Sequence, residues 1–190
     1  MMSDEEVRNA RLAGADDRIV AGRAIDGDIA AFEVLVRRYT PMMRAYVRRV
    51  LGSSSDVDDV VQEAFVVAWQ RLSDLEDPAV VKSWLMRIVS RKAMDRVRAT
   101  RVTLDIDEVE HPPSRAATPD HAVVARAGVE ALNDALGELP DEQRQSWVLR
   151  EIGGFTYEEV AEELGVPVTT VRGLLARARK HIIVRMEEWR

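Results

Sequence analysis

The sequence has no cysteine and only three histidines in 190 residues. The absence of cysteine excludes disulfides, thiolate zinc sites, iron–sulfur clusters and cysteine nucleophiles. The histidines, His111, His121 and His181, stand at no spacing typical of metal ligands, so a metal centre would need mainly carboxylates. We therefore expect no metal site and no cofactor.

Long apolar runs are also missing. No window approaches eighteen consecutive apolar residues, and the chain begins with acidic residues where a secretory signal would be basic and then apolar. We expect a cytoplasmic protein with no membrane insertion. Ten glycines and seven prolines are few, and 46% hydrophobic and 32% charged residues favour helix-rich folded domains over collagenous, disordered or mucin-like classes.

Charge is distributed in blocks. The 27 basic and 33 acidic residues give a net charge of −6, so the whole molecule should be repelled by DNA and any nucleic-acid contact must come from local patches. Seven basic residues stand between Lys82 and Arg101 against one acid, and six stand from Arg172 onward against two acids. Between Glu130 and Glu163 ten acids face two arginines. Such blocks are either solvated faces or binding surfaces, depending on their place on a helix.

Residues 102–122 hold three of the seven prolines, several acids and no helical period, which indicates a linker. At roughly 3.3 Å per residue this segment could extend about 70 Å, so the halves on either side need not touch. Elsewhere apolar residues recur at helical spacing, and no alternating strand pattern occurs. The expected fold is all-α: a flexible tail at 1–15, a helical domain at 16–101, the flexible linker, and a second helical domain at 123–190.

The last helix of the first domain, expected from about residue 79 to 100, carries basic residues on one side. Projected at 100° per residue, three of them and the next arginine fall within about 40° of one line: Arg87, Arg91, Arg98 and Arg101. A basic stripe opposite an apolar face suits a helix that follows phosphates, and Trp84 at its head is placed to stack on an unpaired base. The alternative interpretations are that the basic stripe is only a solvated face and that Trp84 belongs to the core.

The second domain contains a helix-turn-helix pattern. Thr156 and Glu159 predict a capping box, so a helix begins there. It ends at Gly165, and Pro167 starts another helix after a short turn. The apolar face of this second helix consists of Val171, Leu174, Leu175, Ala178 and Ile182. The opposite face holds small residues and cations and suits a DNA major groove, the alternative being a plain helical hairpin: Thr169, Arg172, Gly173, Ala176, Arg177, Arg179 and Lys180.

Several stretches together resemble one family. They are DVDDVVQEAF at 56–65 followed by Trp69, KSWLMRI at 82–88, and the segments from 139 to 151 and from 157 to 179. The chain is similar, from about residue 18 onward, to the extracytoplasmic-function (group 4) sigma factors of the sigma-70 family. The resemblance implies a protein that is not an enzyme, has no catalytic residues and is a monomer when free. It implies binding to core RNA polymerase, recognition of −35 and −10 promoter elements, strand opening at a specific regulon, and control by an anti-sigma factor.

The resemblance assigns the helix at 56–65 to the β′ clamp helices of core polymerase. Asp56, Asp59 and Glu63 stand at i, i+3 and i+7 and offer carboxylates on one face. The rival interpretation, an aspartate-rich metal helix, lacks a second acidic helix with a Glu-x-x-His partner. The implied polymerase-binding residues are Asp56, Asp58, Asp59, Gln62, Glu63 and Phe65.

Two sets of residues are assigned to promoter DNA, and the second domain is also expected to contact the β flap. For the −10 element, with base capture by the loop at 75–83, they are Lys82, Trp84, Arg87, Arg91 and Arg98. For the −35 element they are Thr169, Thr170, Arg172, Arg177 and Lys180. The family's base contacts do not carry over at five positions where the chain departs from the family pattern. These are Ser90, Arg91, Gly173, Leu174 and Ala176.

Two other classes of protein fit parts of the sequence. A helix-turn-helix regulator would bind a palindromic operator as a homodimer without polymerase, and it gives no role to the helix at 56–65. A noncatalytic adaptor or anti-factor would use the helices to bind protein only, which leaves both basic surfaces without a role.

Overall fold

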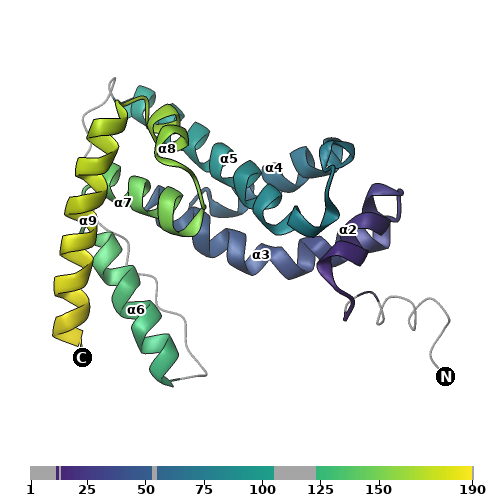
Figure 1. Ribbon diagram of the computed structural model, residues 1–190, viewed down its shortest axis with the longest axis horizontal. Coiled ribbons are helices and arrows are strands. Elements are labelled where there is room, and N and C mark those ends of the chain that lie inside the picture. The colour runs from purple at the N-terminus through teal and green to yellow at the C-terminus, as the bar shows by residue number, and fades with distance from the viewer. Residues whose placement is uncertain (1–11, 13, 53–54, 105–122, 190) are drawn as a thin grey trace.

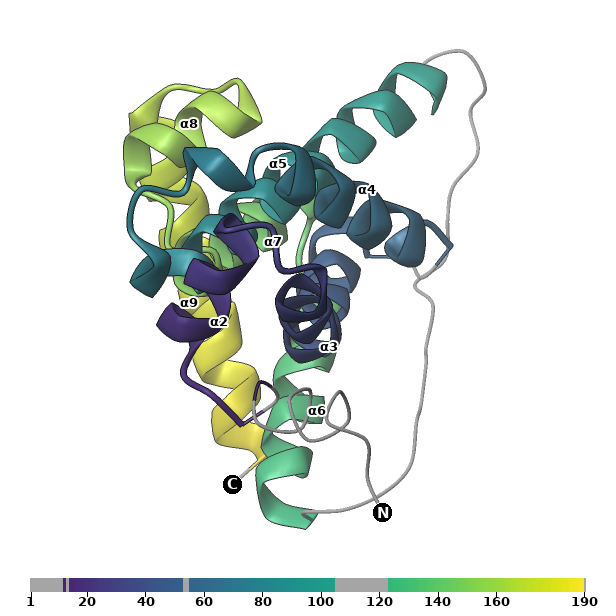
Figure 2. The ribbon, with the colours of Figure 1, turned by 90° about the vertical axis from the view of Figure 1, so that its right-hand side faces the viewer.

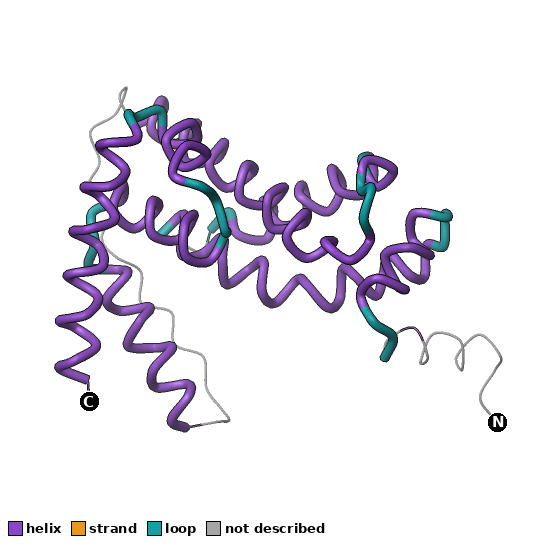
Figure 3. Tube along the Cα trace, in the orientation of Figure 1, coloured by secondary structure: helices purple, strands orange, loops and turns teal. Residues whose placement is uncertain are grey.

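The structure is a computed structural model that describes residues 12, 14–52, 55–104 and 123–189. Every regular element in these ranges is a helix (Figures 1 and 3), which confirms the expected all-α class. Most of the expected tail and residues 105–122 of the expected linker lie outside the described residues. Leu12, inside the range expected to be a tail, is only 3% exposed and joins the hydrophobic core.

The first half of the chain folds around one long helix. Its elements are α2 (Asp17–Ile25), α3 (Ile29–Leu51), α4 (Val57–Gln70), the short 3-10 turns η1 (Leu72–Asp74) and η2 (Pro78–Val80), and α5 (Val81–Leu104). Helix α3 begins where the Asp28 side chain accepts a hydrogen bond from the Ala31 N–H, which satisfies a free backbone donor. It continues through Pro41 and ends at Gly52, whose φ of 70° is left-handed.

Helix α3 supplies the centre of this half. Its inward positions are fully buried at the three-to-four spacing read from the sequence, as in Leu35, Met43 and Val47. Helix α5 lies alongside it (Figure 1) and buries Leu85 and Val89 in the same core. Because α4 packs against both α3 and α5, this core sets where the outer faces of α4 and α5 point.

The second half is a separate run of helices. Its elements are α6 (Val123–Gly137), α7 (Asp141–Trp147), a π-helical turn η3 (Val148–Ile152), α8 (Tyr157–Leu164) and α9 (Val168–Trp189). The capping box is confirmed: the Glu159 N–H donates to the Thr156 hydroxyl (3.1 Å) and the Thr156 N–H donates to the Glu159 carboxylate (2.8 Å). Gly165, with φ 67°, ends α8. Helices α6 and α9 lie side by side (Figures 1 and 2).

The two halves of the chain are in contact in the structure. The length of the linker predicted from the sequence allowed this contact but did not require it. Helices α6 and α7 and η3 pack on α3, and α8 packs on α5. The Arg49 Nε donates to the Asn133 side-chain oxygen (2.9 Å). Arg144 lies so close to Gly52 that a Cβ atom there would come within 2.6 Å of the guanidinium. No helix in the described residues is long and apolar enough to cross a membrane.

Candidate polymerase and promoter interfaces

The carboxylates of α4 are held in two directions. Asp56 and Glu63 reach the same guanidinium, that of Arg96 on α5, at 3.4 and 3.3 Å, and Lys92 lies 3.7 Å from Glu63. Asp58 turns the other way and pairs with Arg44 of α3 at 2.7 Å. These pairs are partly exposed and therefore worth only about 0.2–1 kcal/mol each. A stronger cationic partner is able to replace them.

Asp59 and Gln62, between these pairs, are exposed on the outer face of α4. Within the described part of the chain Asp59 forms no ion pair, so its carboxylate is the one on this helix free for an outside cation. No three acidic or histidine side chains in the described ranges gather as metal ligands would.

An apolar groove of about 470 Å³, which we call the α4 groove, lies beside these carboxylates between α3 and α4. Phe32 contacts Trp69 (ring centroids 4.9 Å apart) and meets Phe65 edge-on (6.4 Å). Phe65 is 8% exposed and forms the wall of the groove, whereas Trp69 and Val66 are 43% and 49% exposed. The sequence pattern did not predict this groove. Its signal was that α4 has more apolar residues than one core-facing stripe requires.

The basic side chains of α5 divide between two neighbours. Arg96 and Lys92 point to α4, and the remaining arginines form what we call the α5 stripe: Arg87, Arg91 and Arg98. The side chain of Arg101 lies outside the described residues. Lys82 is exposed at the head of the helix, and Trp84 is half-buried against the core. The stripe is therefore narrower than the basic block in the sequence.

Ser90 does not belong to this surface. It is fully buried, and its hydroxyl hydrogen-bonds to the Tyr46 hydroxyl (2.7 Å) and the Met86 carbonyl oxygen (2.6 Å). Burial raises the pKa of Tyr46, so the phenol stays protonated. The departure from the family pattern at this position thus concerns packing.

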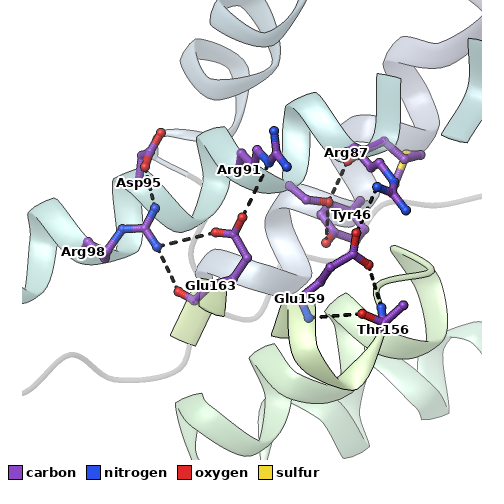
Figure 4. A network of polar contacts seen from close by, with 10 residues as sticks. Tyr46, Arg87, Arg91, Asp95, Arg98, Thr156, Glu159 and Glu163 are labelled. Carbon is purple, nitrogen blue, oxygen red and sulfur yellow. Dashed lines mark hydrogen bonds and ion pairs between the residues drawn. The ribbon is translucent and has the colours of Figure 1, made fainter. Parts of the chain in front are cut away.

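The α5 stripe faces α8 (Figure 4). Arg87 pairs with Glu159 at 2.9 Å, and Arg91 and Arg98 lie 3.6 and 3.5 Å from the Glu163 carboxylate. A hydrogen bond from the Thr156 N–H, followed by the charge of Arg87, lowers the pKa of Glu159. The three arginines expected to hold single-stranded DNA are therefore ion-paired within the chain.

The outer face of α9 has a different environment. Its apolar face is buried as predicted, with Val171, Leu175 and Ala178 at 0% exposure. Leu174 is also buried, so its departure from the family pattern is a matter of packing too. Arg179 pairs with Glu151 at 2.6 Å. The side chains expected to read the −35 element are all exposed: Thr169, Thr170, Arg172, Arg177 and Lys180.

Comparison with known proteins assigns this arrangement to a family. Residues 35–103 match the sigma-70 region 2 model and residues 129–182 match the sigma-70 region 4 model. The chain is 33% identical over 172 residues to the RNA polymerase sigma factor CnrH of Cupriavidus metallidurans, covering 86% of this chain and 90% of the relative. It is 32% identical over 176 residues to the ECF RNA polymerase sigma-E factor of Escherichia coli K12, covering 87% and 92%. The chain belongs to the extracytoplasmic-function sigma factors.

Two solved structures have the same fold as this sigma factor. CnrH in complex with the cytosolic domain of CnrY matches with a TM-score of 0.52 at 33% identity, over 90% of this chain and 97% of that one. The sigma factor RpoE of Bartonella quintana, solved with the anti-sigma factor NepR, matches with a TM-score of 0.58 at 22% identity, over 84% and 98%. The region 2 match thus contains the α5 stripe and all of the described lining of the α4 groove except Phe32, and the region 4 match contains most of α9.

Proposed function

We propose that this sigma factor binds core RNA polymerase, recognises −35 and −10 promoter elements and opens the DNA strands at a specific set of promoters. The observation that carries the proposal is the separation of three surfaces: an acid-and-apolar face on α4, a cationic stripe on α5 and an acid-free cationic face on α9. Strand opening is driven by binding energy, and nucleotide addition is left to the polymerase.

The polymerase interface is assigned to α4. Asp59 offers a free carboxylate to an arginine, and Trp69 and Val66 expose apolar surface next to it. Aromatic side chains in partly formed pockets are typical binding hot spots. A coiled coil with arginines and apolar residues, such as the β′ clamp helices, matches both features. Region 4 is expected to contact the β flap.

Promoter recognition is divided between the two domains. On α9, Arg172 and Arg177 are assigned to guanine edges or phosphates, because Gly173 and Ala176 let the helix approach the major groove closely. On α5, the stripe is assigned to the backbone of the melted strand and Trp84 to an unpaired base. A net charge of −6 keeps nonspecific attraction to free DNA weak, so the polymerase is needed for tight binding.

An anti-sigma factor is the proposed inhibitor. CnrH, at 33% identity, was solved bound to the cytosolic domain of a second protein, which supports the same kind of control here. We place this regulation in the cytoplasm, where the polymerase acts, and on a chain that is monomeric when free.

Run-off transcription with core polymerase tests the proposal. Core plus the purified chain should give discrete transcripts from a library of genomic fragments, and neither component alone should do so. Arg172→Ala with Arg177→Ala should lose these transcripts, while Arg18→Ala with Arg37→Ala, which removes the same charge from exposed positions of the first half of the chain, should keep them. Specific retention of a duplex by the chain without core would instead identify a conventional repressor or activator.

A further inference from the structure

We propose that α8 is an internal competitor for the α5 stripe: the chain covers its own single-strand-binding surface with Glu159 and Glu163 while leaving the α9 face open. The inference rests on the proposed function, since it concerns the surface assigned to the −10 strand. It adds a layer of control that belongs to the chain itself and requires no second protein.

The two helices have matching spacing. Arg87 and Arg91 are four residues apart on α5, and Glu159 and Glu163 are four residues apart on α8, so each pair occupies one helix face. The lower-numbered residues pair at 2.9 Å and the higher-numbered ones at 3.6 Å (Figure 4). Arg98 extends the contact by one further arginine, 3.5 Å from Glu163. Glu159 and Glu163 thus contact three cations, of which Arg98 also pairs with Asp95 of its own helix at 2.6 Å.

The position of Glu163 is not explained by the stability of α8. It stands in the last turn of the helix, where the helix dipole disfavours a negative charge. Its side chain is only 13% exposed, enclosed between Arg91 and Arg98. Arg98 also donates to the Glu163 backbone oxygen at 2.8 Å, one of the carbonyls that a helix end leaves without an internal partner. This carboxylate therefore depends on the α5 stripe for its environment.

The contact between the domains has two parts, one along α3 and one between α5 and α8, which differ in their chemistry. Along α3 it consists of Arg49 with Asn133, Arg144 against Gly52, and Gly153 beside the Tyr46 hydroxyl. The α5–α8 part consists of ion pairs whose arginine side chains remain 49–61% exposed. Pairs of this kind are weak and screened by salt, so another anion can displace them. The phosphates of a nucleic-acid strand carry the same charge as the two carboxylates and can therefore take their place on the arginines.

The consequence is an asymmetry between the two DNA-reading surfaces. The α9 face is exposed in the same structure in which the stripe is paired. When its two domains are in contact, the chain therefore exposes the duplex-reading face of α9 while the strand-binding stripe of α5 is paired with α8. The stripe becomes available only when α8 moves away or when a strand displaces its carboxylates.

The test compares two pairs of substitutions on α8 with the same change in charge. Glu159→Gln with Glu163→Gln removes the covering carboxylates, and glutamine at 159 can still serve the capping box. Glu158→Gln with Glu162→Gln is the matched control, because both residues are exposed and form no ion pair in the described ranges. Glu163→Gln alone is a further variant that leaves the capping box untouched. Circular dichroism verifies that each variant is folded.

Binding is measured without polymerase, by fluorescence anisotropy, to a labelled mixed-sequence single strand of 20 nucleotides and to the same sequence as a duplex. We expect about fivefold tighter single-strand binding for Glu159→Gln/Glu163→Gln than for the control, and an intermediate gain for Glu163→Gln. Arg87 and Arg91 lose their carboxylate partners, whereas Arg98 keeps Asp95 at 2.6 Å, so the slope of log affinity against log salt should steepen by about 1.4. Duplex binding should be equal in the two double variants.

Equal single-strand affinity and salt slope in the variant and its control would overturn the proposal. An equal gain on strand and duplex would also overturn it, because net charge alone would then be responsible. Run-off transcription by the unmodified chain is a separate readout: its failure contradicts the proposed function, whereas a gain in single-strand binding still supports the internal competitor.

Discussion

Charge reversal on α4 separates the contribution of each carboxylate to folding and to polymerase binding. Asp59 is exposed and has no ion pair within the described residues, whereas Glu63 lies 3.3 Å from Arg96 and 3.7 Å from Lys92. Asp59→Lys loses no ion pair but replaces an acid with a cation in the first turn of α4, so it should lower the free energy of unfolding by about 0.5–1 kcal/mol. Glu63→Lys loses two half-exposed pairs and places a cation beside two others, for a cost of about 1–2 kcal/mol.

Affinity for core polymerase should respond to Asp59→Lys more strongly than the free energy of unfolding does. Asp59→Lys brings like charges together at the proposed interface, and we expect core affinity to fall at least about tenfold, or about 1.4 kcal/mol. Urea denaturation measures the folding effect, and anisotropy of a labelled chain titrated with core measures binding. Asp26→Lys, an exposed reversal at the end of α2, is the control. Core affinity of Asp59→Lys within twofold of this control would refute the assignment of α4.

Three further substitutions test individual contacts of the structure. Ser90→Ala strands the buried Tyr46 hydroxyl and should cost about 1–3 kcal/mol in urea denaturation, more than Tyr46→Phe at about 1 kcal/mol; the reverse order would contradict the hydrogen bond. Gly52→Ala meets both a positive φ and a guanidinium and should lower stability by more than about 1 kcal/mol, unlike Gly137→Ala, which has nothing within 4 Å. A hydrogen bond from an α9 arginine lowers the pKa of Glu138, so this stabilisation is present above the ordinary glutamate pKa and is lost as pH falls through the lower folded value. Thermal denaturation from pH 6 to 3 should therefore show a steeper loss for the natural chain than for Glu138→Gln, and parallel curves would contradict it.

Local features were readable from the sequence because short-range physics determines them. The three-to-four spacing predicted the core face of α3, and Val171 and Leu175 of α9 are buried as expected. The capping box at Thr156 and Glu159 formed because both partners lie in one helical turn. The family resemblance then supplied the roles of these helices, and the comparisons confirmed the family.

Contacts between distant segments were not readable. Arg87 and Glu159 are far apart in the chain, and no local pattern links a basic stripe to the acidic helix that covers it. The sequence counted Arg96 among one basic block, but α5 packs against several neighbours, so Arg96 serves α4 while the stripe serves α8. The α4 groove was missed for the same reason, because Phe32 and Trp69 meet only through the packing of α3 on α4.

The most direct test of the central claim is strand opening at a promoter selected by run-off transcription, followed by permanganate reactivity of unpaired thymines. The account predicts reactive thymines near the start site only when core polymerase and this chain are both present, and their loss with Asp59→Lys. Tight, selective binding of the closed duplex by the chain alone, with no thymine reactivity when core is added, would contradict it.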